Sequence, residues 1–219
     1  MTQEMKQRKA LQALWTDQRQ RPDKTLQLWE SAVLLPLRWT KHGWDILFEV
    51  RSSRMHWQPG DICFPGGHRE ETDPTLLATA LRETREELGI PEDQIQVLGP
   101  LDYFYGYSGP LVYPFAGILP DKTPLTIDKN EVAEVFAVPL KDLLTMAPVV
   151  GKVDIGTQQE LGFPTQWAYG FQEGWNVRHR YEVFFYPWKG RIIWGITARV
   201  LHQFLERVRK MGEMPGQPG

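Results

Sequence analysis

The 219-residue sequence contains one cysteine, Cys63. A single cysteine excludes an intramolecular disulfide and any Cys-x-x-Cys metal site. The N-terminal stretch lacks the apolar core of a secretory signal, and no run approaches the roughly 18 apolar residues of a membrane-spanning helix. The net charge is only −2, which gives no general attraction to nucleic acid or to an anionic membrane. We therefore expect a cytoplasmic protein that binds neither.

The sequence does contain alternating strand patterns and amphipathic helix patterns. Strands are predicted over residues 30–38, 45–51, 95–105, 111–119, 132–138, 180–187 and 191–194. Helices are predicted over residues 4–20, 74–89, 139–146 and 195–210, while residues 147–178 fit neither pattern. This mixture predicts an α/β (α+β) fold in which helices flank a mixed β-sheet. We expect an N-terminal helical arm (1–25), one main domain (26–210) and a C-terminal tail (211–219).

The predicted N-terminal helix has an apolar face formed by Leu11, Leu14 and Trp15. This face can pack on the same domain or on a second subunit, so a homodimer stays open. The second predicted helix has clear end signals. Asp73 suits the N-cap and Pro74 the first helical position, while Gly89 ends the helix.

Three glutamates share one edge of the predicted helix 74–89. At about 100° per residue, Glu83, Glu86 and Glu87 form a stripe. This stripe lies beside a core-facing stripe, which consists of Leu77, Ala80, Leu81, Thr84 and Leu88. Each like-charge pair at i,i+3 or i,i+4 destabilises an isolated helix by a few tenths of a kcal/mol.

Two interpretations of the glutamates remain open on helical spacing alone. In the first, the helix is solvated, and Arg82 and Arg85 offset the repulsion. In the second, the carboxylates bind a divalent cation, since clustered hard oxygen ligands suit Mg²⁺ or Mn²⁺. The glycines of Phe64-Pro65-Gly66-Gly67, shortly before the helix, allow close approach of the backbone and favour the second interpretation. A metal here indicates phosphoryl chemistry.

The stretch RETREELGI (82–90) resembles the second half of a Nudix box, G-x5-E-x7-R-E-U-x-E-E-x-G-U, where U is aliphatic. Thr84 occupies the first U position. Counted from Gly67, the acidic position falls on Asp73, and the box is one residue longer than the general pattern. This longer spacing with an aspartate is similar to the coenzyme A pyrophosphatase branch of the Nudix hydrolases.

An upstream signature strengthens the resemblance to that branch. Its approximate form is L-L-T-x-R-[SA]-x3-R-x3-G-x3-F-P-G-G, and residues 47–67 read LFEVRSSRMHWQPGDICFPGG. Arg51-Ser52, Gly60 and the final FPGG are in register. His56 stands where the signature has arginine, and Arg54 lies two residues earlier. Residues 131–144 and 190–201 also resemble later parts of the branch.

The resemblance implies a Nudix-type mixed sheet between helices, an Mg²⁺- or Mn²⁺-dependent hydrolase and roles for particular residues. Glu83, Glu86, Glu87 and the Gly67 carbonyl would bind metal, and the glutamates are also candidates for the general base. Arg82 would orient a glutamate, and Glu131 would supply a further carboxylate, with Glu134 as second choice. The implied substrate-binding residues are Arg51, Ser52, Arg54, His56 and Gly66.

The function implied by the resemblance is hydrolysis of the diphosphate linkage in coenzyme A or a derivative, giving 3′,5′-ADP and 4′-phosphopantetheine or its acyl form. One alternative is a Nudix pyrophosphatase for another nucleoside diphosphate derivative, such as ADP-ribose, NADH or a (d)NTP. A second alternative is a non-catalytic Nudix domain that senses a nucleotide. All three predict a small nucleotide-like partner.

Overall fold

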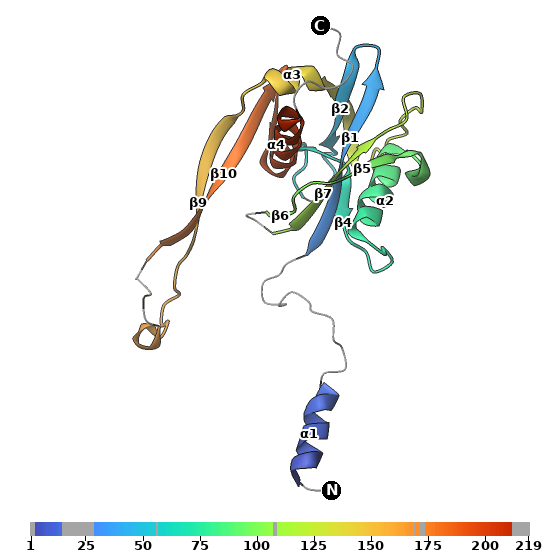
Figure 1. The fold of residues 1–219 in the computed structure, drawn as a ribbon. Coiled ribbons are helices and arrows are strands. Elements are labelled where there is room, and N and C mark those ends of the chain that lie inside the picture. The colour runs from blue at the N-terminus through green and yellow to red at the C-terminus, as the bar shows by residue number, and fades with distance from the viewer. Residues whose placement is uncertain are drawn as a thin grey trace.

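A mixed β-sheet with helices on both faces forms the centre of the fold (Figure 1). The computed structural model describes residues 3–14, 29–55, 57–106, 109–168, 170 and 174–211. Within these residues the main sheet has eight strands. They are β1 (Glu30–Thr40), β2 (Gly43–Arg51), β3 (Ile62–Cys63), β4 (Gly66–His68), β5 (Gln96–Pro100), β6 (Phe104–Tyr105), β7 (Leu111–Ile118) and β8 (Val132–Pro139).

Strand β1 is the centre of this sheet. It pairs in parallel with β7, from Glu30 opposite Leu111 to Leu37 opposite Ile118. It pairs antiparallel with β2 and with the short β4. Strand β2 also pairs with β3 and β8, so β2 and β1 are both interior strands. A two-residue turn at residues 41 and 42 joins them.

Side chains that alternate along β1 and β2 build a separate core on each face of the sheet. On one face, Ala32, Leu34 and Leu47 pack with Ala80 and Leu88 of α2 (Leu76–Leu88). On the other face, residues of both strands pack with α4 (Gly195–Lys210). They are Leu35, Leu37, Ile46, Phe48, Leu201 and Leu205. This arrangement confirms the predicted α/β fold with a mixed sheet between helices.

A second, three-stranded antiparallel sheet lies on the α4 side of the molecule (Figure 1). Its order is β11 (Arg191–Trp194), β10 (Asn176–Trp188) and β9 (Val149–Thr157). Helix α3 (Leu140–Thr145) leads into β9, and η3 (Thr165–Trp167) lies in the connection between β9 and β10. The unassigned residues 147–178 therefore contain a long strand that pairs with the predicted strand 180–187, which begins earlier, at Asn176.

The start of α2 differs from the sequence prediction. Thr75, not Asp73, is the N-cap, because the Thr75 hydroxyl accepts a hydrogen bond from the Ala78 N–H at 3.1 Å. The end is as predicted: Gly89 caps the helix with a left-handed φ of 71°, and η2 (Glu92–Gln94) follows. The described part of the N-terminal helix is α1 (Gln3–Leu14). No helix within the described residues is long and apolar enough to span a membrane.

Candidate metal centre and substrate cavity

The FPGG segment, which bends at Pro65 and enters β4 at Gly66, brings the main chain against two glutamates of α2. A Cβ on Gly66 would lie 2.4 Å from the Ala32 carbonyl oxygen, so only glycine fits there. A Cβ on Gly67 would lie 2.5 Å from Glu83 Oε1. The Gly66 N–H donates to Glu87 Oε2 at 2.9 Å. The structure therefore places the FPGG segment beside Glu83 and Glu87, two of the predicted metal ligands.

Arg82 joins the acidic residues around this segment. Its Nε and Nη2 atoms donate to both oxygens of Asp73, at 3.0 and 3.1 Å. Its Nη1 atom lies 2.9 Å from Glu83 Oε1 and 3.0 Å from Glu86 Oε2. Nη2 also donates to the His68 carbonyl at 3.0 Å. This geometry agrees with an orienting role for Arg82. Asp73, which is not the N-cap of α2, instead holds the Arg82 side chain in place.

Asp73 is buried and the Arg82 side chain is partly buried, and their charges act on each other strongly. Hydrogen bonds from Arg82 hold the pKa of Asp73 well below its usual range, although burial acts in the opposite direction. The pKa of Arg82 is raised by the same hydrogen bonds. Burial raises the pKa of Glu83 more than the nearby Arg82 lowers it. Asp73 and Arg82 are thus a fixed ion pair, while Glu83 lacks full compensation of its charge.

Glu86 has a different environment from Glu83 and Glu87. Its side chain is 48% exposed and pairs with Arg82 at 3.0 Å and with Arg85 at 2.9 Å. It does not line the cavity described below. In this conformation Glu86 therefore lies outside the group formed by Glu83 and Glu87, and a metal-binding role requires its carboxylate to leave the two arginines.

Glu49 is a site residue that the sequence analysis missed. It lies on β2 and is 1% exposed. Its side chain contacts that of Glu87, which is 4% exposed. Burial raises the pKa of Glu49 to about 8, and burial together with the charge of Glu49 raises the pKa of Glu87. The available signal was an acid between the apolar residues Phe48 and Val50 of the predicted strand 45–51.

The structure separates the two candidates for a downstream carboxylate. Glu131 lines the same cavity as Glu83 and Glu87, and its backbone carbonyl accepts the Ser52 N–H at 2.7 Å. Glu134 instead accepts two hydrogen bonds from Arg191, at 2.9 and 3.0 Å, and does not line that cavity. Glu131 is therefore the candidate that lies beside the acidic group.

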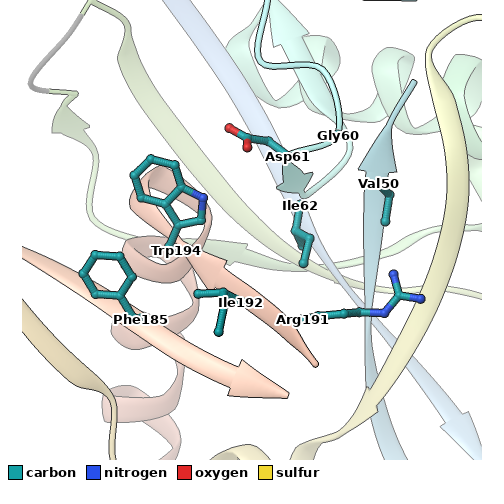
Figure 2. A pocket seen from close by; sticks show the side chains of 8 residues that line it. All are labelled: Val50, Gly60, Asp61, Ile62, Phe185, Arg191, Ile192 and Trp194. Atoms are coloured by element: carbon teal, nitrogen blue, oxygen red, sulfur yellow. The ribbon is translucent and has the colours of Figure 1, made fainter. Parts of the chain in front are cut away.

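The carboxylates border a cavity of about 480 Å³. Its other walls carry aromatic and apolar side chains, including Trp29, Met55, Trp57, Phe64, Val112, Trp194 and Ile196. A second cavity of about 550 Å³ adjoins it and shares Asp61, Ile62 and Trp194 (Figure 2). In the second cavity the rings of Phe185 and Trp194 stack at 6.1 Å with an interplanar angle of 4°.

Only some of the predicted substrate-binding residues line this cavity. Arg51 and Gly66 line it, and Arg51 Nε donates to the Trp57 carbonyl at 3.1 Å. Ser52 is buried, and its Oγ accepts the Arg54 N–H at 3.3 Å. The Arg54 side chain donates to Asn130 Oδ1 at 3.4 Å and does not line the cavity. His56 lies outside the described residues.

Within the described residues, no three His, Cys, Asp or Glu side chains form a group that could hold a metal ion. An open Mg²⁺ site does not need three such side chains, since Mg²⁺ commonly takes one or two carboxylates and completes its coordination with water and phosphate. Three observations fit such a cation: two buried carboxylates side by side, a buried Glu49 oxygen with no hydrogen-bond partner in the described part of the chain, and Gly67 packed on Glu83. The donors present therefore suit Mg²⁺ or Mn²⁺.

Fold and site together define an α/β protein with a carboxylate-bordered cavity beside the FPGG segment. The NUDIX domain family model matches residues 28–154. The chain belongs to the Nudix hydrolase family, whose members typically use divalent metals.

Two bacterial relatives show how far the similarity extends. An "Uncharacterized Nudix hydrolase NudL" from Photorhabdus laumondii is 32% identical over 179 residues, covering 82% of this chain and 84% of the relative. A protein of the same description from Pectobacterium atrosepticum is 32% identical over 174 residues and 80% of each chain. Among solved structures, the NUDIX domain of Shewanella oneidensis NrtR, crystallised with ADP ribose, is 21% identical with a TM-score of 0.45. That match covers 67% of this chain and 89% of that one.

Proposed function

We propose that this protein is a metal-dependent Nudix hydrolase that cleaves the diphosphate linkage of coenzyme A or a derivative. The products would be 3′,5′-ADP and 4′-phosphopantetheine or its acyl form. The observation that carries the proposal is the placement of Glu83, Glu87 and Glu131 at one cavity with Arg51 and the FPGG segment. The one-residue-longer box and the upstream signature of residues 47–67 support the coenzyme A branch.

The proposal assigns the metal to the acidic border of the cavity. Glu83 and Glu87, the Gly67 carbonyl and, after release from its arginines, Glu86 would hold Mg²⁺ or Mn²⁺. A bound cation would neutralise charge on the phosphate oxygens and lower the pKa of a water molecule. Arg82 acts through Asp73, Glu83 and Glu86 as a positioning residue, because its five donors fix carboxylates on several sides.

The remaining roles concern substrate and water. Glu131 is the candidate to accept the proton of the attacking water, since it is exposed and lines the same cavity as Glu83 and Glu87. Arg51 and Gly66, which line the cavity, would contact a phosphate of the substrate, and Arg54 would join them after leaving Asn130. Ser52 and His56 are the other proposed contacts. The tryptophan-rich walls would hold an adenine ring or the pantetheine arm, and the adjoining cavity (Figure 2) provides apolar surface for the far end of that arm.

A hydrolysis screen tests the substrate class. Purified protein would be given coenzyme A, acyl-CoA, NADH, ADP-ribose and dNTPs, each with Mg²⁺ and with Mn²⁺. We expect coenzyme A or acyl-CoA to be cleaved most efficiently. If coenzyme A stays intact while ADP-ribose, NADH or a dNTP is cleaved rapidly, the proposed substrate is wrong. The proposed hydrolysis of a diphosphate linkage would still hold. Nucleotide binding without any turnover would favour a sensor.

Glu87→Gln tests the metal assignment. This variant keeps the shape of the side chain and should lower kcat by at least about 100-fold, because the loss of several kcal/mol of charge stabilisation has that effect. Circular dichroism should show an unchanged fold. Glu206→Gln is the matched control, since Glu206 pairs with Arg209 on α4. Normal turnover in Glu87→Gln would defeat the assignment.

A further inference from the structure

The buried carboxylate of Glu49 lacks the partners that a buried charge requires. Glu49 lies on the α2 side of β2, the same face as Leu47, and opposite Cys63 of β3. Its Oε2 accepts a hydrogen bond from the Cys63 thiol at the long distance of 3.9 Å, and its side chain also contacts the carboxyl group of Glu87. Its Oε1 is fully buried and has no hydrogen-bond donor among the described residues.

Nearby cations do not neutralise Glu49 and Glu87. Among the ion pairs found within the described residues, none includes either glutamate. Arg82 is fully used by Asp73, Glu83 and Glu86. Arg51 is near enough to act on Glu49 electrostatically, but its Nε is bound to the Trp57 carbonyl. Two adjacent buried carboxylates without a cation are strongly unfavourable, so either a proton or a metal ion must lie between them.

The place of Glu49 in the sequence and in the fold favours a metal ion over a proton. In the upstream signature that residues 47–67 resemble, threonine occupies this position, so a carboxylate is not needed to build the strand. Glu87 lines the cavity, and Glu49, which does not line it, is in contact with Glu87. A cation between them therefore has a route to solvent and to a phosphate oxygen past Glu87. Two carboxylates are enough for Mg²⁺ or Mn²⁺ when water and phosphate supply the other ligands.

We propose that Glu49 and Glu87 together hold a divalent cation at the floor of the cavity, deeper than the position at Glu83. Glu49 is then a metal ligand of this chain that the Nudix box does not contain. Glu87 bridges the two positions, because its carboxylate contacts Glu49 on one side and borders the cavity on the other. The inference rests on the proposed function in one respect, that the chain binds divalent cations.

Binding of Mn²⁺ without substrate tests this site separately from activity. Wild type, Glu49→Gln and the control Glu206→Gln would be freed of metal and titrated with Mn²⁺, with bound ion measured by calorimetry and by the electron paramagnetic resonance signal of free Mn²⁺. We expect Glu49→Gln to bind one Mn²⁺ fewer per chain, or to bind it at least tenfold more weakly, and the control to match wild type.

Thermal unfolding gives a second readout on the same proteins. In chelator, Glu49→Gln should be at least as stable as wild type, because one of two buried like charges is gone. Mn²⁺ should raise the Tm of wild type clearly more than that of Glu49→Gln. If Glu49→Gln does not fold, Glu49→Thr carries the residue of the signature at this position and takes its place.

The outcomes separate the two proposals. Mn²⁺ binding by Glu49→Gln with the number and affinity of wild type overturns the Glu49 site, shows that a proton neutralises the pair, and leaves the proposed function intact. Wild type that binds no Mn²⁺ by either readout overturns both the Glu49 site and the metal-dependent function. Loss of one ion in Glu49→Gln alone supports the Glu49 site.

Discussion

At the scale of single residues, Gly67 shows how tightly the candidate site is built. A Cβ at this position would lie 2.5 Å from Glu83 Oε1 and 2.6 Å from its Cδ. The obstructing atoms are the end of a flexible side chain, so the chain can still fold. We expect Gly67→Ala to displace the Glu83 carboxylate and lower kcat about 10–100-fold, as loss of support around a metal ligand commonly does. Steady-state kinetics across Mg²⁺ concentrations would measure this.

Gly151→Ala is the control for the glycine change. Gly151 lies in β9, away from the carboxylates, and its Cβ would lie 3.3 Å from a ring atom of Phe185. This variant should keep the wild-type kcat. Equal kcat values for Gly67→Ala and wild type would show that Glu83 does not need its observed position.

The residues differ in how well the sequence could predict their environment. Glu83 and Glu87 lie at the same cavity, as their i,i+4 spacing predicts, because helical periodicity is local and fixes which side chains share a face. The sequence ranked Glu131 above Glu134, but the physical difference between them is non-local: Glu131 lines the cavity, and Glu134 pairs with Arg191, more than fifty residues away. Glu49 was missed because its burial comes from pairing with β3 and β8 and packing of α2, which are non-local contacts.

At the scale of elements, the Asp73–Arg82 pair ties the segment before α2 to the middle of that helix. Asp73 also accepts hydrogen bonds from the Glu70 N–H at 3.0 Å and the Thr79 hydroxyl at 2.9 Å. Asp73→Asn should lower the free energy of unfolding by about 1.5–3 kcal/mol at neutral pH, the usual loss for hydrogen bonds to a buried charged group. Chemical denaturation would measure it, with the exposed Asp121→Asn as control.

The pH dependence of this effect follows from the direction of the pKa shift. The folded-state pKa of Asp73 lies below its ordinary value of 3.8, so the folded protein binds fewer protons here than the unfolded chain. Its contribution to stability is therefore complete well above pH 3.8 and is lost as the pH falls through the folded-state pKa. The stability difference between wild type and Asp73→Asn should shrink in acid; a constant difference would contradict the ion pair.

Element boundaries were predictable where a local signal exists. Helix α4 begins and ends at the predicted residues, 195 and 210, and Gly89 ends α2 as its left-handed φ requires. The N-cap of α2 was misplaced because Asp73 and Thr75 are both good caps, and the long-range bond to Arg82 decides between them. Strand β9 was missed because its partner β10 supplies the pairing and its side chains are mostly exposed.

At the scale of the whole molecule, helix α4 joins the two sheets into one core. Tyr186 of β10 and Ile193 of β11 are fully buried and belong to the same apolar cluster as Leu35 and Phe48 of the main sheet. The Tyr186 hydroxyl is 2.8 Å from His202 Nδ1 on α4. The Thr197 hydroxyl donates to the Ile62 carbonyl of β3 at 2.9 Å. These contacts predict that the small sheet and the main sheet unfold together.

Ile193→Ala tests this coupling, because it removes a buried side chain from the small sheet only. We expect the free energy of unfolding to fall by about 2–5 kcal/mol, the usual range for such a truncation, in a single transition at lower Tm. Ile192→Ala is the matched control, since the neighbouring side chain points to the opposite face and is 47% exposed. Calorimetry should show one peak for both variants. Two separate peaks in Ile193→Ala would mean that the small sheet unfolds independently of the sheet that carries the glutamates.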